Sequence, residues 1–456
     1  FLLAAAHFEP LVTGVEGGLV PRIADWWGPA DSGRVLRVRI KPGRWSDNER
    51  LTAADLIFTI EQHLRPGSTS PMLPVLLRIA GAKEFHEGRS QFVAGLVAES
   101  ARTVAITLDA PDANYVARLT TLLVLPAHVY AGRDLAAPGT FRLPPVGSGA
   151  YLASQWGDDG TVVLTPNPQV KPFTRLDRVI GRYAPPQDVI GALKKRSLDV
   201  AMAIPGRDLN RVPDGYEVLT EPGRSVIGLS GRGPLADVRV RRAMAYAVDR
   251  QGLLDRSFGD HGRVSDSVLF EPDWATSPQR ATYPYDPERA RALLAEAGWQ
   301  PQTEVHLVAL TPDNADRAVW DEVIQQLGAV GIRAVITVRP VSDRPAAWAD
   351  PAVDGVVDVY AMPIPDPVLA EGWVSCGSAS DYCNPRLDEL LTQGRTESDP
   401  TARQATYQQV DRILSEELPV IPLWVPDATV AVVNGRGGVS PSVQPVTATI
   451  DYLGPA

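Results

Sequence analysis

The spacing of apolar residues along the chain predicts strands that alternate with helices. In residues 35–40 and 103–108, apolar and polar residues alternate with the two-residue period of a strand. A third strand candidate is residues 161–164, with Val162 and Val163 at its centre. Elsewhere, apolar residues recur at the spacing of one helix face. The helix candidates are residues 53–63, 237–248, 286–297, 316–327 and 399–414, with a further strand over residues 332–338. This alternation is typical of the α/β class.

Several of these predicted helices carry residues that favour helix ends. Thr52 can cap the helix that begins at Ala53, and Asp55 lies in its first turn, where the helix dipole favours an anion. Pro287 stands at the first position of another helix, and Gly298 follows its end. Proline at the start and glycine after the end are the usual order, so these boundaries are well specified.

Length and charge narrow the class of protein. A chain of 456 residues predicts two or three domains. The formal net charge of -10 disfavours a nucleic-acid partner, because nucleic acids select basic surfaces.

No stretch approaches the ~20 apolar residues that span a bilayer. Residues 1–6 resemble part of a signal-peptide core without its basic segment, so we expect them to belong to the folded protein.

Motifs that would indicate an enzyme are missing. The sequence has no P-loop, no G-x-G-x-x-G and no H-E-x-x-H motif. Gly147-Ser148-Gly149 is not a nucleophile elbow, which requires G-x-S-x-G. The six histidines are scattered along the chain. We therefore expect no catalysis, no cofactor and no metal site.

Eight segments of the sequence occur in a fixed order, and none of them is a catalytic motif. They are residues 8–12, 19–27, 36–55, 146–151, 188–200, 235–250, 285–299 and 381–391. In order and spacing they resemble the extracytoplasmic solute-binding proteins of ABC importers for oligopeptides, dipeptides and nickel, known as family 5. The most specific segment is 235–250, which contains Asp237-Val238-Arg239-Val240-Arg241. The resemblance covers nearly the whole chain.

The resemblance implies an α/β, two-lobed fold of the periplasmic-binding-protein type (class II, or cluster C) with an extra inserted domain and a ligand cleft between the lobes. Lobe one would comprise residues 1–30, 144–225 and 425–456. The inserted domain would cover residues 31–143, and the opposing lobe residues 226–424. Such proteins trap a ligand as their lobes close.

The resemblance also implies a function. The chain would capture a peptide or peptide-like solute and deliver it to the permease subunits of an ABC importer. It would be a monomer outside the cytoplasm, in the periplasm or on the outer face of the cell membrane, held by a lipid on an N-terminal segment upstream of this chain. Two alternatives stay open: a binder of sugars or other small solutes, and a lipoprotein of the same fold that has lost transport and regulates a partner protein.

The ligand site is expected around the strand and loop of residues 357–366. Peptide-binding relatives carry there an Asp that pairs with the ligand's amino terminus, but Pro363 occupies the matching position. Asp366 is a possible substitute. Ser230 stands where many relatives have Asn, and its shorter side chain would leave room for a ligand. The expected ligand contacts are Tyr360, Met362, Asp366, Trp373, Ser230 and Trp348.

Other residues of these segments have structural interpretations. Asp47, Asp55 and Asp199 are expected in turns and caps. Arg239, Arg241 and Arg242 fit either an anion site or a solvated or lobe-bridging helix face. In an exported protein, Cys376 and Cys383 are expected to form a disulfide, with two buried free thiols as the alternative. Two cysteines alone do not suit structural zinc, which takes four ligands.

Overall fold

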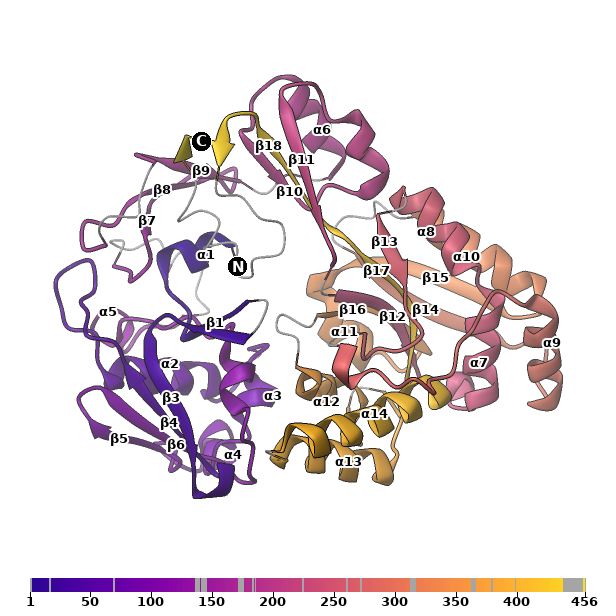
Figure 1. Cartoon of the computed structure of the whole chain (residues 1–456), viewed down its shortest axis with the longest axis horizontal. Helices are drawn as coiled ribbons and strands as arrows, with labels where there is room; N and C mark the ends of the chain where they lie inside the picture. The colour runs from indigo at the N-terminus through magenta and orange to yellow at the C-terminus, as the bar shows by residue number, and fades with distance from the viewer. Residues whose placement is uncertain are drawn as a thin grey trace. The chain divides into compact units, whose positions relative to one another are not determined.

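The chain forms two compact units in a computed structural model (Figure 1). The first unit joins Phe1–Tyr183 to Gly435–Ala456, and the second is Ala184–Asn434. The structure describes residues 2–15, 18–68, 70–135, 140, 146–170, 176–182, 184, 186–223, 225–259, 261–270, 273–311, 317–361, 366–378, 380–397, 399–437 and 454–455. The three-part division expected from the family resemblance stays a prediction.

The first unit contains a four-stranded antiparallel sheet, in the order β3-β4-β6-β5, and a three-stranded sheet, β7-β8-β9. Two short pairs, β1-β2 and β19-β20, accompany them. The helices are α1 (Leu2–His7), α2 (Ala53–Leu64), α3 (Leu73–Leu76), α4 (Ala82–His86) and α5 (Ala127–Tyr130). The strands are β1 (Val12–Val15), β2 (Gly18–Pro21), β3 (Ala24–Ala30), β4 (Val35–Ile40), β5 (Leu96–Ser100), β6 (Thr103–Thr107), β7 (Tyr151–Trp156), β8 (Val162–Pro166), β9 (Val179–Gly181), β19 (Arg436–Gly437) and β20 (Gly454–Pro455).

One apolar core holds the four-stranded sheet and α2 together. In β4 the residues facing the core, Leu36, Val38 and Ile40, alternate with exposed residues, as the sequence period requires. The helix α2 buries Leu56 and Ile60 in the same core. The predicted strands and the predicted helix of this region are therefore confirmed.

The second unit is built around a six-stranded mixed sheet in the order β13-β17-β12-β16-β14-β15. The pairs β14-β15 and β14-β16 are parallel, and the others are antiparallel. A separate antiparallel sheet has the order β10-β18-β11. The strands are β10 (Val200–Met202), β11 (Tyr216–Glu221), β12 (Ser225–Gly231), β13 (Gly262–Val264), β14 (Glu304–Thr311), β15 (Arg333–Pro340), β16 (Gly355–Ala361), β17 (Val420–Pro426) and β18 (Ala428–Val433).

Helices cover both faces of the six-stranded sheet. Odd-numbered residues such as Leu229, Leu307 and Val357 pack in the core formed with α7, α9 and α10. Even-numbered residues such as Val356 and Tyr360 face the opposite side, with α11 to α14. The helices are α6 (Pro186–Lys194), α7 (Val238–Ala247), α8 (Arg250–Phe258), α9 (Pro287–Glu296), α10 (Arg317–Ala329), α11 (Arg344–Ala349), α12 (Glu371–Val374), α13 (Pro385–Thr396) and α14 (Pro400–Glu417). Because a strand has a two-residue period, successive residues of β12, β14 and β16 serve opposite faces.

The helix predictions of this unit are also confirmed, with small shifts of their ends. Asp237 caps α7 by accepting a hydrogen bond from the N–H of Arg239. Pro287 begins α9, and Gly298 follows it with a φ of 69°. Within the described part of the chain, no helix combines the length and apolar character needed to cross a membrane.

Candidate ligand-binding site

The structure brings together three of the six residues expected to contact a ligand. Ser230 in β12 and Tyr360 in β16 lie on the same face of the sheet, and their hydroxyl oxygens are 2.6 Å apart. The ring of Tyr360 packs edge to face with Trp373 of α12, with centroids 5.3 Å apart. We call these three residues the Ser230–Tyr360–Trp373 cluster. A hydrogen-bonded pair of hydroxyls and an aromatic side chain suit recognition of a small organic ligand.

Burial differs within the cluster. Tyr360 is only 6% exposed and Ser230 only 2%, whereas Trp373 is partly exposed. Burial also raises the pKa of the Tyr360 hydroxyl, which therefore stays neutral and can donate a hydrogen bond. Trp373 is the member most open to its surroundings, and Tyr360 and Ser230 support it from the sheet.

A second polar pair lies on the same face of β16. Asp358 precedes Tyr360 by two residues, so both side chains point to the same side of the strand. Arg344, the first residue of α11, donates Nε and Nη2 to the two oxygens of Asp358 at 2.5 and 2.7 Å. The Asp358 side chain is 8% exposed and that of Arg344 is 43% exposed. Asp358 is thus a buried carboxylate whose charge is balanced by a half-exposed guanidinium.

The carboxylate of Asp366 makes structural contacts. It caps the short 3₁₀ helix Pro367–Ala370 by accepting from the N–H of Val368 at 2.9 Å. It also accepts from Nη2 of Arg403, which lies in α14, at 2.7 Å. The guanidinium of Arg403 in turn lies over the rings of Trp274 and Tyr407. Asp366 therefore holds α12, with Trp373, against α14.

Two further expected contacts are Met362 and Trp348. Met362 and Pro363 fall outside the described residues, so the structure does not place them. Trp348 lies in α11, partly buried against an apolar cluster that includes Val308 and Val356, and its carbonyl accepts from Nη1 of Arg232. Trp348 shares a sheet face with the Ser230–Tyr360–Trp373 cluster but belongs to a different side-chain cluster.

Sequence reasoning missed Arg344, Asp358, Arg395 and Arg403. Arg395 pairs with Glu371 in α12, so two ion pairs fix the segment that carries Trp373. One signal was available: Asp358 stands inside a run of apolar strand residues, where a carboxylate needs a cationic partner. The identity of that partner depends on the tertiary fold.

The arginines of α7 serve the structure. The buried guanidinium of Arg241 donates to the carbonyl oxygens of Leu235, Ala236 and Glu417, and Arg242 donates to the carbonyl of Glu416. The contacts with Glu416 and Glu417 satisfy carbonyls at the C-terminal end of α14, which a helix leaves unpaired. Arg241 is therefore not solvated, and its donors are directed at backbone oxygens.

The carboxylate of Asp55 also has a structural role. It accepts from the backbone N–H of Thr52 at 2.8 Å and that of Ala127 at 2.9 Å, and from the indole N–H of Trp45 at 3.3 Å. Asp47 accepts from the N–H of Glu49 and from a ring nitrogen of His128. The predicted turn and capping roles of these two residues are confirmed.

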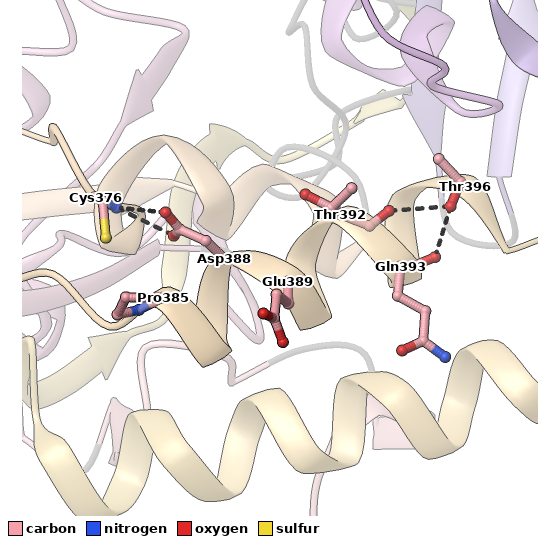
Figure 2. A pocket seen from close by; sticks show the side chains of 7 residues that line it. All are labelled: Cys376, Pro385, Asp388, Glu389, Thr392, Gln393 and Thr396. Atoms are coloured by element: carbon pink, nitrogen blue, oxygen red, sulfur yellow. Dashed lines mark hydrogen bonds between the residues drawn. The ribbon is translucent and has the colours of Figure 1, made fainter.

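The predicted disulfide between Cys376 and Cys383 is confirmed. Beside it lies a surface hollow of about 790 Å³, lined mainly by one side of α13 (Figure 2). Asp388 in this hollow accepts from the backbone N–H of Cys376, and the hydroxyl of Thr396 donates to carbonyls of its own helix. None of the five expected ligand contacts that the structure describes lines this hollow. Among the residues that the structure describes, no group of three or more His, Cys, Asp or Glu side chains could hold a metal ion.

Comparison with known proteins identifies relatives along the whole chain. The periplasmic murein peptide-binding protein MppA of Escherichia coli (strain K12) is 26% identical over 91% of this chain and 82% of its own length. Two solved structures match the fold over 100% of this chain. AppA of Bacillus subtilis in complex with a nonapeptide has a TM-score of 0.83 at 18% identity and is covered to 94%. NikZ of Campylobacter jejuni in complex with Ni(L-His) has a TM-score of 0.83 at 20% identity and is covered to 95%.

A family model gives the same assignment from the sequence alone. The model of the bacterial extracellular solute-binding proteins, family 5 Middle, matches residues 18–375. This match spans β2 to α12, so it includes β12, β16 and the residues of the Ser230–Tyr360–Trp373 cluster. The two-lobed binding-protein fold expected from the sequence is confirmed by the structural matches. The chain belongs to the family 5 extracellular solute-binding proteins, a family of binding proteins of ABC importers.

Proposed function

We propose that this protein captures a peptide or peptide-like solute outside the cytoplasm and delivers it to the membrane permease of an ABC importer. The observation that carries the proposal is the family match over residues 18–375. The ligand would lie between two lobes, as the family fold implies, and closure would present a surface to the permease. The protein would act as a monomer anchored by a lipid on a segment upstream of this chain.

The choice of a peptide rests on relatives and is refined by this chain's own residues. MppA is named as a murein peptide-binding protein, and AppA was solved with a nonapeptide. NikZ, with Ni(L-His), indicates that the same fold accommodates other small ligands. Because Asp366 is bonded to Arg403, capture of a free peptide amino terminus by Asp366 would first have to break that pair. A modified peptide fits this arrangement.

Trp373 is the side chain that we expect to contribute most to ligand contact. It is partly exposed, it rests on the buried Tyr360, and two ion pairs fix its helix. A rigid aromatic surface loses little conformational entropy when a ligand binds. Ser230, Tyr360, Met362, Asp366 and Trp348 complete the proposed set of contacts.

The first test is native mass spectrometry of the purified protein, compared with its denatured mass. We expect a small molecule that is released on denaturation, and its mass would give the ligand class. A peptide pool is then added and thermal unfolding measured, since a ligand at 100 times its Kd stabilises the folded state by about 2.7 kcal/mol.

A matched pair of tryptophan variants locates the site. Trp373→Ala should weaken binding of the identified ligand by about tenfold or more, as truncation of an interface aromatic often does. Trp156→Ala, at an exposed position of β7, should leave binding unchanged. Equal losses in both variants would argue against the proposed site. No bound molecule and no thermal shift with peptides or sugars would instead favour a transport-inactive regulator.

A further inference from the structure

We propose that Arg344 binds a carboxylate of the ligand, so that this protein recognises its solute through an acid group and does not require a free ammonium. The inference rests on the proposed function and names the charge class of its ligand. It follows from a difference between two kinds of group on the sheet face that carries the Ser230–Tyr360–Trp373 cluster. One edge of an arginine is open there, whereas carboxylates are ion-paired.

The geometry of Arg344 leaves one edge of its guanidinium open. Nε and Nη2 both bond to Asp358, whereas Nη1 has no hydrogen-bond partner among the described residues. The side chain is 43% exposed while the carboxylate beneath it is 8% exposed. A guanidinium that is held on one edge by a buried carboxylate keeps a fixed orientation, so it loses little entropy when it binds an anion. The open edge can donate hydrogen bonds to a carboxylate oxygen.

Arg344 is adjacent to the proposed ligand contacts on two sides. On α11 it stands four residues before Trp348, so the two side chains share one helix face. On β16 its partner Asp358 stands two residues before Tyr360, on the same strand face. Tyr360 is hydrogen-bonded to Ser230. The open edge of Arg344 thus belongs to the same region as the hydroxyl pair.

The acidic side chains of β16 and of the segment that carries Trp373 are each ion-paired. Asp358 is paired with Arg344, Asp366 with Arg403, and Glu371 with Arg395. At these three carboxylates a ligand ammonium would have to displace an arginine, which costs several kcal/mol. A ligand carboxylate needs no such displacement at Arg344.

Three pools of tripeptides of equal composition test the inference: free peptides, N-acetylated peptides and C-amidated peptides. Binding is measured by native mass spectrometry and titration calorimetry on the unmodified protein. We expect amidation to weaken binding by about tenfold or more and acetylation to change it by less than about threefold. Arg344→Gln should weaken binding of the free peptides to the level of the amides and leave the amides unchanged.

Two further variants separate recognition from loss of structure. Arg344→Lys keeps the positive charge but lacks the planar guanidinium with its paired donors, so it should retain part of the preference for the free acid. Arg333→Gln removes an arginine of β15 that is 63% exposed and should change nothing. Unaltered binding of the amide pool to Arg344→Gln would itself show that the site is folded.

The outcomes distinguish the inference from the proposed function. Peptides that bind equally well with and without a free carboxylate, or that lose binding on acetylation alone, would overturn the carboxylate assignment and leave peptide capture intact. No binding from any pool would overturn peptide capture and the assignment with it. A preference for the acid that persists in Arg344→Gln would move the anion site to another residue.

Discussion

At the scale of single residues, Gly149 shows how a family motif follows from packing. A Cβ atom at this position would lie 2.0 Å from the carbonyl oxygen of Ala6. The N–H of Gly149 donates to the carbonyl of His7 at 2.9 Å, which fixes the close approach of the turn to α1. We expect Gly149→Ala to destabilise the first unit by about 1–3 kcal/mol, because α1 would have to move. Urea unfolding followed by circular dichroism measures this loss.

Gly328 is the matched control for that substitution. It lies in α10 with no atom within 4 Å of an added Cβ. Since alanine favours a helix over glycine by about 1 kcal/mol, Gly328→Ala should leave stability unchanged or raise it. A comparable loss in both variants would show that the approach of Gly149 to α1 is not the cause.

Individual residue types could be predicted from sequence more readily than their partners. Ser230 and Tyr360 were expected near a ligand, and the structure joins their hydroxyls. Asp366 was offered as a substitute for the missing acid, yet Arg403, 37 residues away in sequence, occupies it. The sequence around a serine, a tyrosine or an aspartate does not show whether its side chain has a partner in the fold. Pairing depends on which helices the fold brings to one face.

At the scale of elements, the C-terminal end of α14 depends on α7. Arg241, which is 6% exposed, donates to the carbonyl of Glu417 at that end and to the carbonyls of Leu235 and Ala236 just before α7. We expect Arg241→Met to cost about 1–3 kcal/mol for each buried carbonyl left without a donor. Arg239→Gln on the same helix is the control, because that exposed side chain pairs with Asp237 at the surface and should contribute less to stability than the buried Arg241. Equal effects of the two substitutions on unfolding would contradict the capping role.

Elements with a clear period and caps were predicted, and those without were not. The helix α2 combines an apolar face with a capping box at Thr52 and Asp55, so both its face and its start follow from sequence. The strand β17 is buried at every residue from Val420 to Val425 and shows no alternation. A strand that is covered on both faces has no two-residue period, so pattern reasoning does not distinguish it from a buried helix segment.

At the scale of the whole molecule, the family resemblance supplied what periodicity could not. The order of the eight family-like segments predicted a binding-protein fold, and the structural matches confirm it. The order β13-β17-β12-β16-β14-β15 places strands far apart in sequence side by side. Local patterns specify the individual strands of such a sheet but not their order, because the order depends on long crossovers.

The two units also carry buried groups that respond to acid in opposite ways. Burial lowers the pKa of His7 in the first unit from 6.5 to about 4, and its Nδ1 accepts from the N–H of Ala153. Burial raises the pKa of Asp411 in the second unit, although Ser267, Ser277 and Arg280 act in the other direction. Oδ1 of Asp411 has no hydrogen-bond partner in the part of the chain that is described.

These pKa shifts predict that a decrease in pH changes the stabilities of the two units in opposite directions. Between pH 6.5 and about 4, the unfolded chain binds a proton at His7 that the folded unit excludes. The first unit should therefore lose roughly 2–4 kcal/mol over this range. Asp411 holds its proton above the unfolded value of 3.8, so its contribution to the second unit decreases as the pH rises. Acid thus lowers the stability of the first unit, and in the second unit it removes the cost of a buried charge.

Scanning calorimetry at several pH values, on the protein and on two variants, measures this divergence. His7→Gln should flatten the acid dependence of the first unit's transition, and Asp411→Asn should raise the second unit's transition temperature at pH 7 because the amide is neutral at every pH. His306→Gln, at an exposed position, should leave both transitions unchanged. If both transitions decrease together on acidification in all variants, then a charge effect distributed over the whole molecule outweighs these two buried groups.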